Sequence, residues 1–297
     1  RLMSSLSLGS TFSAKFLLWF FTLWLMLLAI SVAVTNTPIL SLLEYAYFSL
    51  LGILGAIFAN STGAGGGVVF IPMFNQLNFT ESQAIATSFG IQCFGMTAGG
   101  ITWWRHYQKD KLDLRLWQGF KRIIAVVTVS SVIGLWVTYG LDVESPSSLH
   151  QSFSWFSLLL GVFIVGTIYL VKPSRESSQL SSFDYVALIL IGLIGGALTA
   201  WLSVGVGELL AIYLILRRFD VTMAVAAAVV VSAFTVWSAI WQHTLVDFAL
   251  YWQVVVFAGP GAVIGGIFAK TLVGYLSATR LKLFFAFWLL VIGIAGI

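Results

Sequence analysis

Long apolar stretches recur along this sequence and decide what it can fold into. They run for roughly 17 to 25 residues, each long enough to cross about 30 Å of hydrocarbon as a helix. Apolar residues make up 59% of the chain and charged residues only 9%, against about a quarter charged in an average soluble domain. Backbone polar groups need partners inside the protein when lipid surrounds them, so such segments have to be helical. The sequence predicts an all-α polytopic membrane protein with no soluble domain.

Seven of these stretches have the length of one crossing, and two are longer. Single spans are predicted at 16–34, 82–104, 117–141, 154–171, 221–241, 249–270 and 280–297. The first is longer than the apolar region of a usual signal peptide, so we expect an extra N-terminal helix. The longer units, 40–77 and 184–216, each contain a Gly-rich interruption. Each therefore either turns back as a re-entrant hairpin or crosses twice, and both alternatives return the chain to its starting side.

The basic residues test this count of crossings. If the N-terminus is cytoplasmic and both long units return to their own side, all fifteen Lys and Arg residues fall on the cytoplasmic side. Counting each long unit as one crossing would place the basic cluster at 105–122 outside. The sequence thus predicts a multi-pass protein of the cell (inner or plasma) membrane with a cytoplasmic N-terminus. The net charge of +4 reflects this bias, and we expect the lipid bilayer as a partner and no nucleic acid.

A constant shift of 140 residues relates the two halves of the chain. It pairs small and aromatic residues without a gap: Gly52 with Gly192, Gly55 with Gly195, Gly65 with Gly205, Gly67 with Gly207, Phe79 with Phe219, Ala84 with Ala224, Ala86 with Ala226 and Phe94 with Phe234. Chance matching of small residues in membrane helices is the alternative. Matched helix interruptions in two inverted-topology repeats are typical of secondary transporters. We expect an N-terminal segment with the first helix (1–37), a first repeat (38–172), a linker (173–183) and a second repeat (184–297).

The first interruption reads NSTGAGGGVVFIP at 60–72. A break in a membrane helix frees N–H and C=O groups, which must then face protein or a wet cavity. Helices restarting near Gly67 and near Gly207 would point their positive N-terminal ends at one region, and no Lys or Arg lies deep in a predicted span. Such a region suits a small anion, although close packing through small residues is the alternative. The predicted binding residues are Asn60, Ser61, Thr62, Gly63, Ala64, Gly65, Gly66 and Gly67 in the first break, and Trp201, Ser203, Val204, Gly205, Val206 and Gly207 in the second.

Three further polar residues are predicted at membrane depth. Gln92 lies halfway along its span and the 140-residue shift places Ser232 halfway along the related span, so each could donate a hydrogen bond to an oxyanion or join two helices. Glu208 lies in the first turn after the second break. An ionisable residue inside a span is a functional candidate. Glu208 either binds and releases a proton during transport, or caps its own helix as a water-facing carboxylate.

Other function classes lack the residues they need. No His or Asp at membrane depth is placed to activate a serine, so an intramembrane hydrolase has no base. Cys93 is the only cysteine, and the spans hold no cluster of His, Cys or carboxylates for a metal. We expect no enzyme, no cofactor and no metal site. A structural assembly subunit stays open as an alternative, although it has no need of two matched helix breaks.

The motifs also carry a resemblance. The run GAGGGVVFIP (63–72), the following TESQAIATS (80–88) and a weaker second copy around Gly205 to Glu208 resemble the TauE/SafE family of membrane permeases. The resemblance covers most of residues 40–297, and the second copy departs from the family's run of glycines by reading SVGVGE at 203–208. Members of this family export sulfite or carry sulfur-containing organic anions.

We therefore expect a secondary transporter that works by alternating access around a site between the repeats. The resemblance implies a small sulfur-containing anion as substrate, such as sulfite or an organosulfonate, and Glu208 suggests coupling to protons. The alternatives are a different small carboxylate or an inorganic anion, or an assembly subunit that transports nothing. The sequence leaves the direction of transport and the oligomeric state open.

Overall fold

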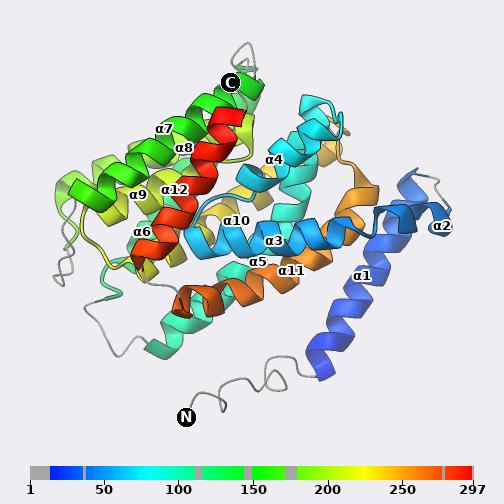
Figure 1. Cartoon of the computed structure of the whole chain (residues 1–297), viewed down its shortest axis with the longest axis horizontal. Helices are drawn as coiled ribbons and strands as arrows, with labels where there is room; N and C mark the ends of the chain where they lie inside the picture. The colour runs from blue at the N-terminus through cyan, green and yellow to red at the C-terminus, as the bar shows by residue number, and fades with distance from the viewer. Residues whose placement is uncertain are drawn as a thin grey trace.

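The computed structural model describes residues 14–35, 38–110, 116–143, 149–170, 179–275 and 278–295, which form helices and no strand. Most of the predicted linker, 173–183, lies outside these residues. The helices, shown in Figure 1, are α1 (Ala14–Thr35), α2 (Ile39–Leu42), η2 (Leu43–Tyr45), α3 (Phe48–Thr62), α4 (Gly67–Gln76), α5 (Glu81–Asp110), α6 (Phe120–Gly140), α7 (Leu149–Leu170), α8 (Ser182–Leu202), α9 (Val206–Leu216), α10 (Val221–Leu245), α11 (Trp252–Tyr275) and α12 (Ala278–Ala295).

The helices confirm the predicted fold class, an all-α polytopic membrane protein. Among the described residues, α1, α5, α6, α8, α10 and α11 contain stretches long and apolar enough to cross a membrane, and α3, α7 and α9 contain shorter apolar ones. Helix α1 lies at one edge of the molecule (Figure 1) and touches the rest chiefly through α11, where the Trp24 indole donates to the Val256 carbonyl at 3.0 Å. Helices α3 to α12 all contribute side chains to one continuous core.

The first long unit is a broken hairpin. Helix α3 ends at Thr62, and after a short break α4 begins at Gly67. Two contacts show that α4 runs back along α3. The Phe70 ring fills the space where Gly55 has no side chain, and the Phe74 ring centroid lies 6.2 Å from that of Phe48. The chain thus returns toward the end of α3 from which it came.

The second long unit, α8–α9, has the same form. A Cβ on Gly195 would lie 2.7 Å from Val206 Cα, so α9 starts beside the middle of α8. At the other end of α9, Arg217 forms an ion pair with Asp184 near the start of α8, at 2.6 and 2.9 Å. Helix α9 has 11 residues and is about 16 Å long, too short to cross a bilayer. Of the two alternatives for this unit, the structure favours the re-entrant hairpin.

The ion pair that ties the arms of this hairpin gives a first prediction. The Asp184 carboxylate is fully buried and also accepts from Tyr213 Oη, so Arg217→Gln would leave a buried charge without its partner. We expect this change to cost about 2 kcal/mol of unfolding free energy, measured as a lower unfolding temperature in detergent. Arg218→Gln is the matched control, because the neighbouring Arg218 is exposed. Equal unfolding temperatures for the two variants would contradict this role of the ion pair.

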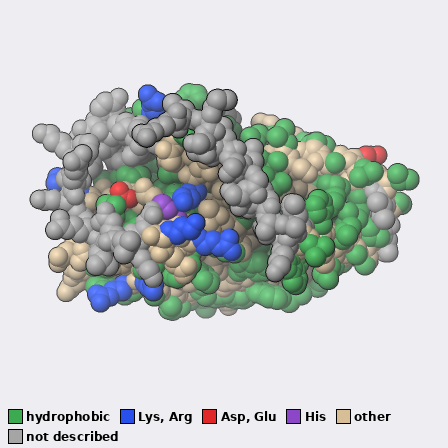
Figure 2. Space-filling model, turned by 90° about the horizontal axis from the view of Figure 1, so that it is seen from below, with side chains coloured by type: hydrophobic (Ala, Val, Ile, Leu, Met, Phe, Trp, Pro, Cys, Tyr) green, Lys and Arg blue, Asp and Glu red, His purple; other side chains and the backbone are tan. Residues whose placement is uncertain are grey.

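The two hairpins enter the molecule from opposite ends of α5. The open end of α3–α4 lies where α5 begins, since Phe79, just before α5, stacks on Phe74 with ring centroids 5.0 Å apart. The open end of α8–α9 lies near the end of α5, where Leu180 contacts Gly119 in the connection from α5 to α6. Basic residues gather at this second end, and Figure 2 shows Lys and Arg side chains together in one region of the face it presents. They include Arg105, Lys109, Lys121, Arg122 and Arg217.

Helix packing follows the 140-residue shift as well. Helix α3 packs on α11, and α8 packs on α6, as Figure 1 shows for α3 and α11. Both contacts are close: Gly52 of α3 lies against the Ala258 carbonyl, and Gly192 of α8 lies against the side chain of Ser130. The related helices α5 and α10 pack against each other. These pairings agree with two repeated units, while the boundaries at 38–172 and 184–297 stay predictions.

Candidate functional site

The two helix breaks meet inside the protein. Helix α3 ends in a left-handed residue, Gly63 (φ 83°), and α8 ends in another, Ser203 (φ 57°). A Cβ on Gly67 would lie 2.6 Å from the Ser203 carbonyl oxygen, and a Cβ on Gly207 would clash with the Gly63 carbonyl oxygen in the same way. Since 63 pairs with 203 and 67 with 207, the two contacts are related by the same shift. Reciprocal contacts of this kind are those of a two-fold axis.

Glu208 connects the beginnings of both half-helices. Its Oε1 accepts a hydrogen bond from the Gly65 backbone N–H at 2.7 Å, and its Oε2 accepts one from the Gly205 N–H at 2.8 Å. Gly65 lies just before α4, and Gly205 is the N-cap of α9. The carboxyl group is fully buried. It therefore caps its own helix, one of the two predicted alternatives, but it does so away from water and reaches the other helix end as well.

Gln92 of α5 holds the first break against the second. Its Oε1 accepts from the Gly66 N–H at 2.8 Å. Its Nε2 donates to the Ser203 carbonyl and hydroxyl oxygens at 3.1 and 2.8 Å and to Ser88 Oγ at 3.0 Å. Both polar atoms of this buried amide thus join α5 to the two breaks. Because the Gln92 oxygen accepts from the Gly66 N–H, the backbone N–H groups at the start of α4 are available to bind an acceptor oxygen.

A small cavity adjoins these groups, with about 190 Å³ of empty space including its opening. The Ser232 hydroxyl of α10 lines it, is buried, and has no hydrogen-bond partner among the described residues. No Lys or Arg is among the described residues that line it, so backbone N–H groups, the Gln92 amide and the hydroxyls of Thr199, Ser203 and Ser232 are the donors present. The lining residues are Gly65, Gln92, Thr199, Ser203, Val204, Gly205, Val206, Gly207, Glu208, Ser232 and Val236.

The comparison with protein families bears directly on this geometry. The profile of the family described as "Sulfite exporter TauE/SafE" matches residues 48–296. The chain belongs to the TauE/SafE family. The match begins at the first residue of α3, so it contains both broken hairpins and leaves out α1, α2 and η2. Searches among curated proteins and among solved structures found no match. This TauE/SafE protein is a multi-pass membrane protein of a transporter family.

The other predicted binding residues of this TauE/SafE chain lie around the breaks without lining the cavity. Ser61 and Thr62 donate to the Phe58 carbonyl of their own helix, and the Thr62 oxygen accepts from the Ala64 N–H. Asn60 donates to carbonyls of α3 and α5. Trp201 lines a second cavity. Gly63, Gly66 and Gly67 form the turn itself.

Val236 lines the cavity without having been predicted, and two polar contributors to the site were also not predicted as binding residues. Thr199 accepts from the Val206 N–H at 3.1 Å and so satisfies a donor at the start of α9. Ser88 lies in the TauE/SafE motif at 80–88 and accepts from Ser203 Oγ at 3.0 Å. The sequence signal that could have indicated Thr199 is its place one helical turn before the second break, where a hydroxyl can accept from a freed backbone N–H. Among the described residues, no three His, Cys, Asp or Glu side chains lie close enough to hold a metal ion.

Proposed function

We propose that this protein is a secondary transporter for a small sulfur-containing anion, such as sulfite or an organosulfonate, and that it couples transport to protons by alternating access. It is not an enzyme in this proposal. One observation carries it: the Glu208 carboxylate accepts backbone N–H groups from the starts of both half-helices. An anionic group thus occupies the place where two positive helix ends converge.

The carboxylate suggests how an anion would be bound. Sulfite and sulfonates present oxygens that accept the same hydrogen bonds as a carboxylate. The cavity is small, and Glu208 already uses the Gly65 and Gly205 donors. The substrate and the ionised Glu208 therefore exclude each other from these donors. The unpartnered Ser232 hydroxyl lines the same cavity and would bind a further substrate oxygen, and Gln92 would bind another once its bonds to Ser203 and Ser88 break.

Mutual exclusion supplies the coupling. When Glu208 takes up a proton, it loses its charge and releases the backbone donors, so that the anion can bind. When the anion leaves, the carboxyl group gives up the proton and returns to the two helix ends. In both the loaded and the empty protein, the binding site opens to the other side of the membrane as one repeat moves against the other. One proton therefore crosses with each anion in the same direction.

Transport into liposomes tests this function. Purified protein in proteoliposomes should accumulate radiolabelled sulfite or a small sulfonate when the outside is more acidic than the inside, and protein-free liposomes should not. Sulfate, acetate and phosphate belong in the panel, because the alternative is a carrier for another small anion. If no anion moves in any gradient, the transporter proposal is wrong and an assembly subunit takes its place; accumulation driven only by the opposite gradient would reject symport.

The placement in the membrane is part of the proposal. The basic residues at the end of α5 and the start of α6 support a plasma or inner membrane protein with this end in the cytoplasm. Helix α1 starts on the same side if it crosses once, so the N-terminus would also be cytoplasmic. The two halves, 38–172 and 184–297, would then be repeats of opposite orientation.

A further inference from the structure

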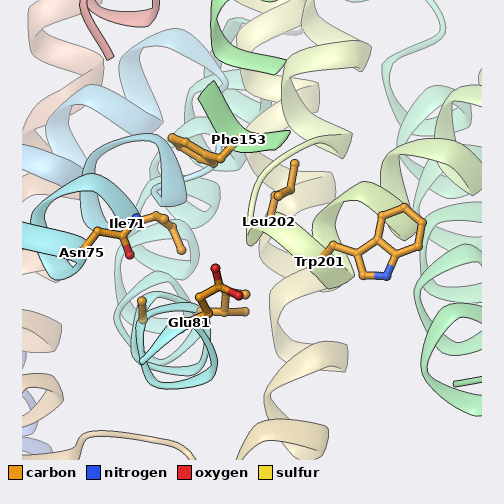
Figure 3. Close-up of a pocket in the computed structure, with 8 residues that line it drawn as sticks. Ile71, Asn75, Glu81, Phe153, Trp201 and Leu202 are labelled. Carbon is orange, nitrogen blue, oxygen red and sulfur yellow. The ribbon is translucent and has the colours of Figure 1, made fainter. Parts of the chain in front are cut away.

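A second cavity lies at the end of the molecule where α5 begins. Figure 3 shows Ile71, Asn75, Glu81, Phe153, Trp201 and Leu202 around it, contributed by α4, α5, α7 and α8. Its empty space is about 270 Å³ including the opening. Glu81 is exposed and Asn75 is half-buried, whereas Ile71, Phe153 and Leu202 are buried. The cavity therefore leads from the surface into the protein.

The inner end of this cavity adjoins the central site. Leu202 lines the outer cavity, and the next two residues, Ser203 and Val204, line the central one. Ser203 is held there by hydrogen bonds to Gln92 and Ser88 of α5. The end of α8 thus forms the wall between the two cavities, and the side chains of Gln92 and Ser88 tie that wall to α5 through hydrogen bonds to Ser203.

We propose that the outer cavity is the vestibule through which the anion reaches the central site from the face where α5 begins, with Leu202 as its gate. This inference rests on the proposed function. Opening requires the end of α8 to leave α5, which breaks the Gln92–Ser203 and Ser88–Ser203 hydrogen bonds. The same movement would free the amide N–H groups of Gln92, which bind Ser203 while the wall is closed.

Glu81 fits a role in selecting the anion. Within the motif at 80–88, Thr80 and Gln83 cap α5 through each other's backbone N–H groups, and the Thr87 hydroxyl accepts from the Tyr251 N–H. Glu81 takes no part in these contacts and directs its carboxylate toward the vestibule (Figure 3). Among the lining residues that the structure describes, it is the one ionisable side chain. A negative charge at the mouth repels a dianion more than a monoanion, so Glu81 would favour anions of single charge.

The position related to Ile71 in the other half is closely packed. Ala211 is related to Ile71 by the 140-residue shift and is buried. It lies beside Gly63, where an added Cβ would be 3.4 Å from the Ala211 methyl and 3.0 Å from that of Ala228. Ala211 therefore lines neither cavity among the described residues and provides a control position for Ile71.

Cysteine labelling tests the vestibule without measuring transport. Cys93 is the only cysteine and is buried, so Cys93→Ala gives a background into which Ile71→Cys, Asn75→Cys or Ala211→Cys is introduced. The probe is a membrane-impermeant thiosulfonate that carries a sulfonate group, added from the face where α5 begins. We expect Ile71→Cys and Asn75→Cys to react at least about tenfold faster than Ala211→Cys, because reaction requires access to the thiol. Elution as a single species in gel filtration shows that each variant is folded.

The charge of the probe tests Glu81. In the Asn75→Cys background, Glu81→Gln should raise the labelling rate of the anionic probe about threefold relative to a cationic thiosulfonate. Equal labelling of Ile71→Cys and Ala211→Cys, or no labelling of Ile71→Cys and Asn75→Cys in folded protein, would overturn the vestibule. An unchanged rate ratio in Glu81→Gln would overturn the selection. If labelling follows the prediction but no anion moves in liposomes, the proposed function fails and the access path stands.

Discussion

Glu208→Gln is expected to abolish the effect of the pH gradient on anion uptake. A Gln side chain does not bind or release a proton at the pH values on either side of the membrane, so anion uptake with the pH gradient should equal uptake without it. The amide keeps one acceptor oxygen for the Gly65 or the Gly205 N–H. Exchange of labelled for unlabelled anion across the membrane should therefore persist, slowed by about tenfold or less. The measurement compares gradient-driven uptake and exchange in the same proteoliposomes.

Glu44→Gln is the control for this substitution, because Glu44 lies in η2 and is exposed. It should leave both uptake and exchange at the level of the unchanged protein. If Glu208→Gln still accumulates the anion with the gradient, Glu208 is not the coupling group. If it loses exchange together with uptake while the protein stays folded, the carboxyl group serves binding and the mutual-exclusion mechanism is wrong.

Gly67→Ala and Gly207→Ala are expected to disrupt the contact between the breaks. The new methyl of Gly67→Ala would lie 2.6 Å from the Ser203 carbonyl oxygen, and that of Gly207→Ala would lie 2.5 Å from Ser232 Oγ and close to the Gly63 carbonyl. Backbone has to move to make room, which costs about 3 kcal/mol of unfolding free energy. We expect transport at background level and a lower unfolding temperature in detergent for both variants.

Gly274→Ala provides the comparison, since nothing lies within 4 Å of the position of its added Cβ. It should transport normally and be as stable as the unchanged protein or slightly more stable, because Ala favours helix over Gly. Normal transport by Gly67→Ala would show that the breaks do not need to touch. If Gly67→Ala lowers the unfolding temperature but transports normally, the contact between the breaks stabilises the fold and is not needed for transport.

The sequence predicted the helices and the two broken units well, because both depend on local features. The length of an apolar stretch predicts a membrane span, and the Gly-rich segments at 63–67 and 205–207 predict where a span is interrupted. The choice between a hairpin and a double crossing was not accessible, since glycines permit both. It depends on how far α9 continues and on the pairing of Arg217 with Asp184, which are 33 residues apart.

The candidate site was accessible only in part. Glu208 stood out as a carboxyl group inside a span, but its bond to Gly65 joins residues 143 positions apart, and no local pattern reports such a contact. Ser61 and Thr62 were predicted from their polarity to bind substrate. Their hydroxyls bond carbonyls of their own helix, a common choice for Ser and Thr in helices that periodicity does not reveal.

The crossed packing of the halves has a consequence for how the protein is made. Helix α3 has its most extensive contact with α11, and α8 has its most extensive contact with α6. Phe48 leaves the ribosome about 200 residues before Trp252, which is a delay of roughly 10 to 40 seconds at ordinary rates of synthesis. Throughout that time the broken hairpin α3–α4 is in the bilayer without its main partner, with the backbone groups of its break still to be covered. We therefore expect insertion machinery or lipid headgroups to shelter this segment until the second half arrives.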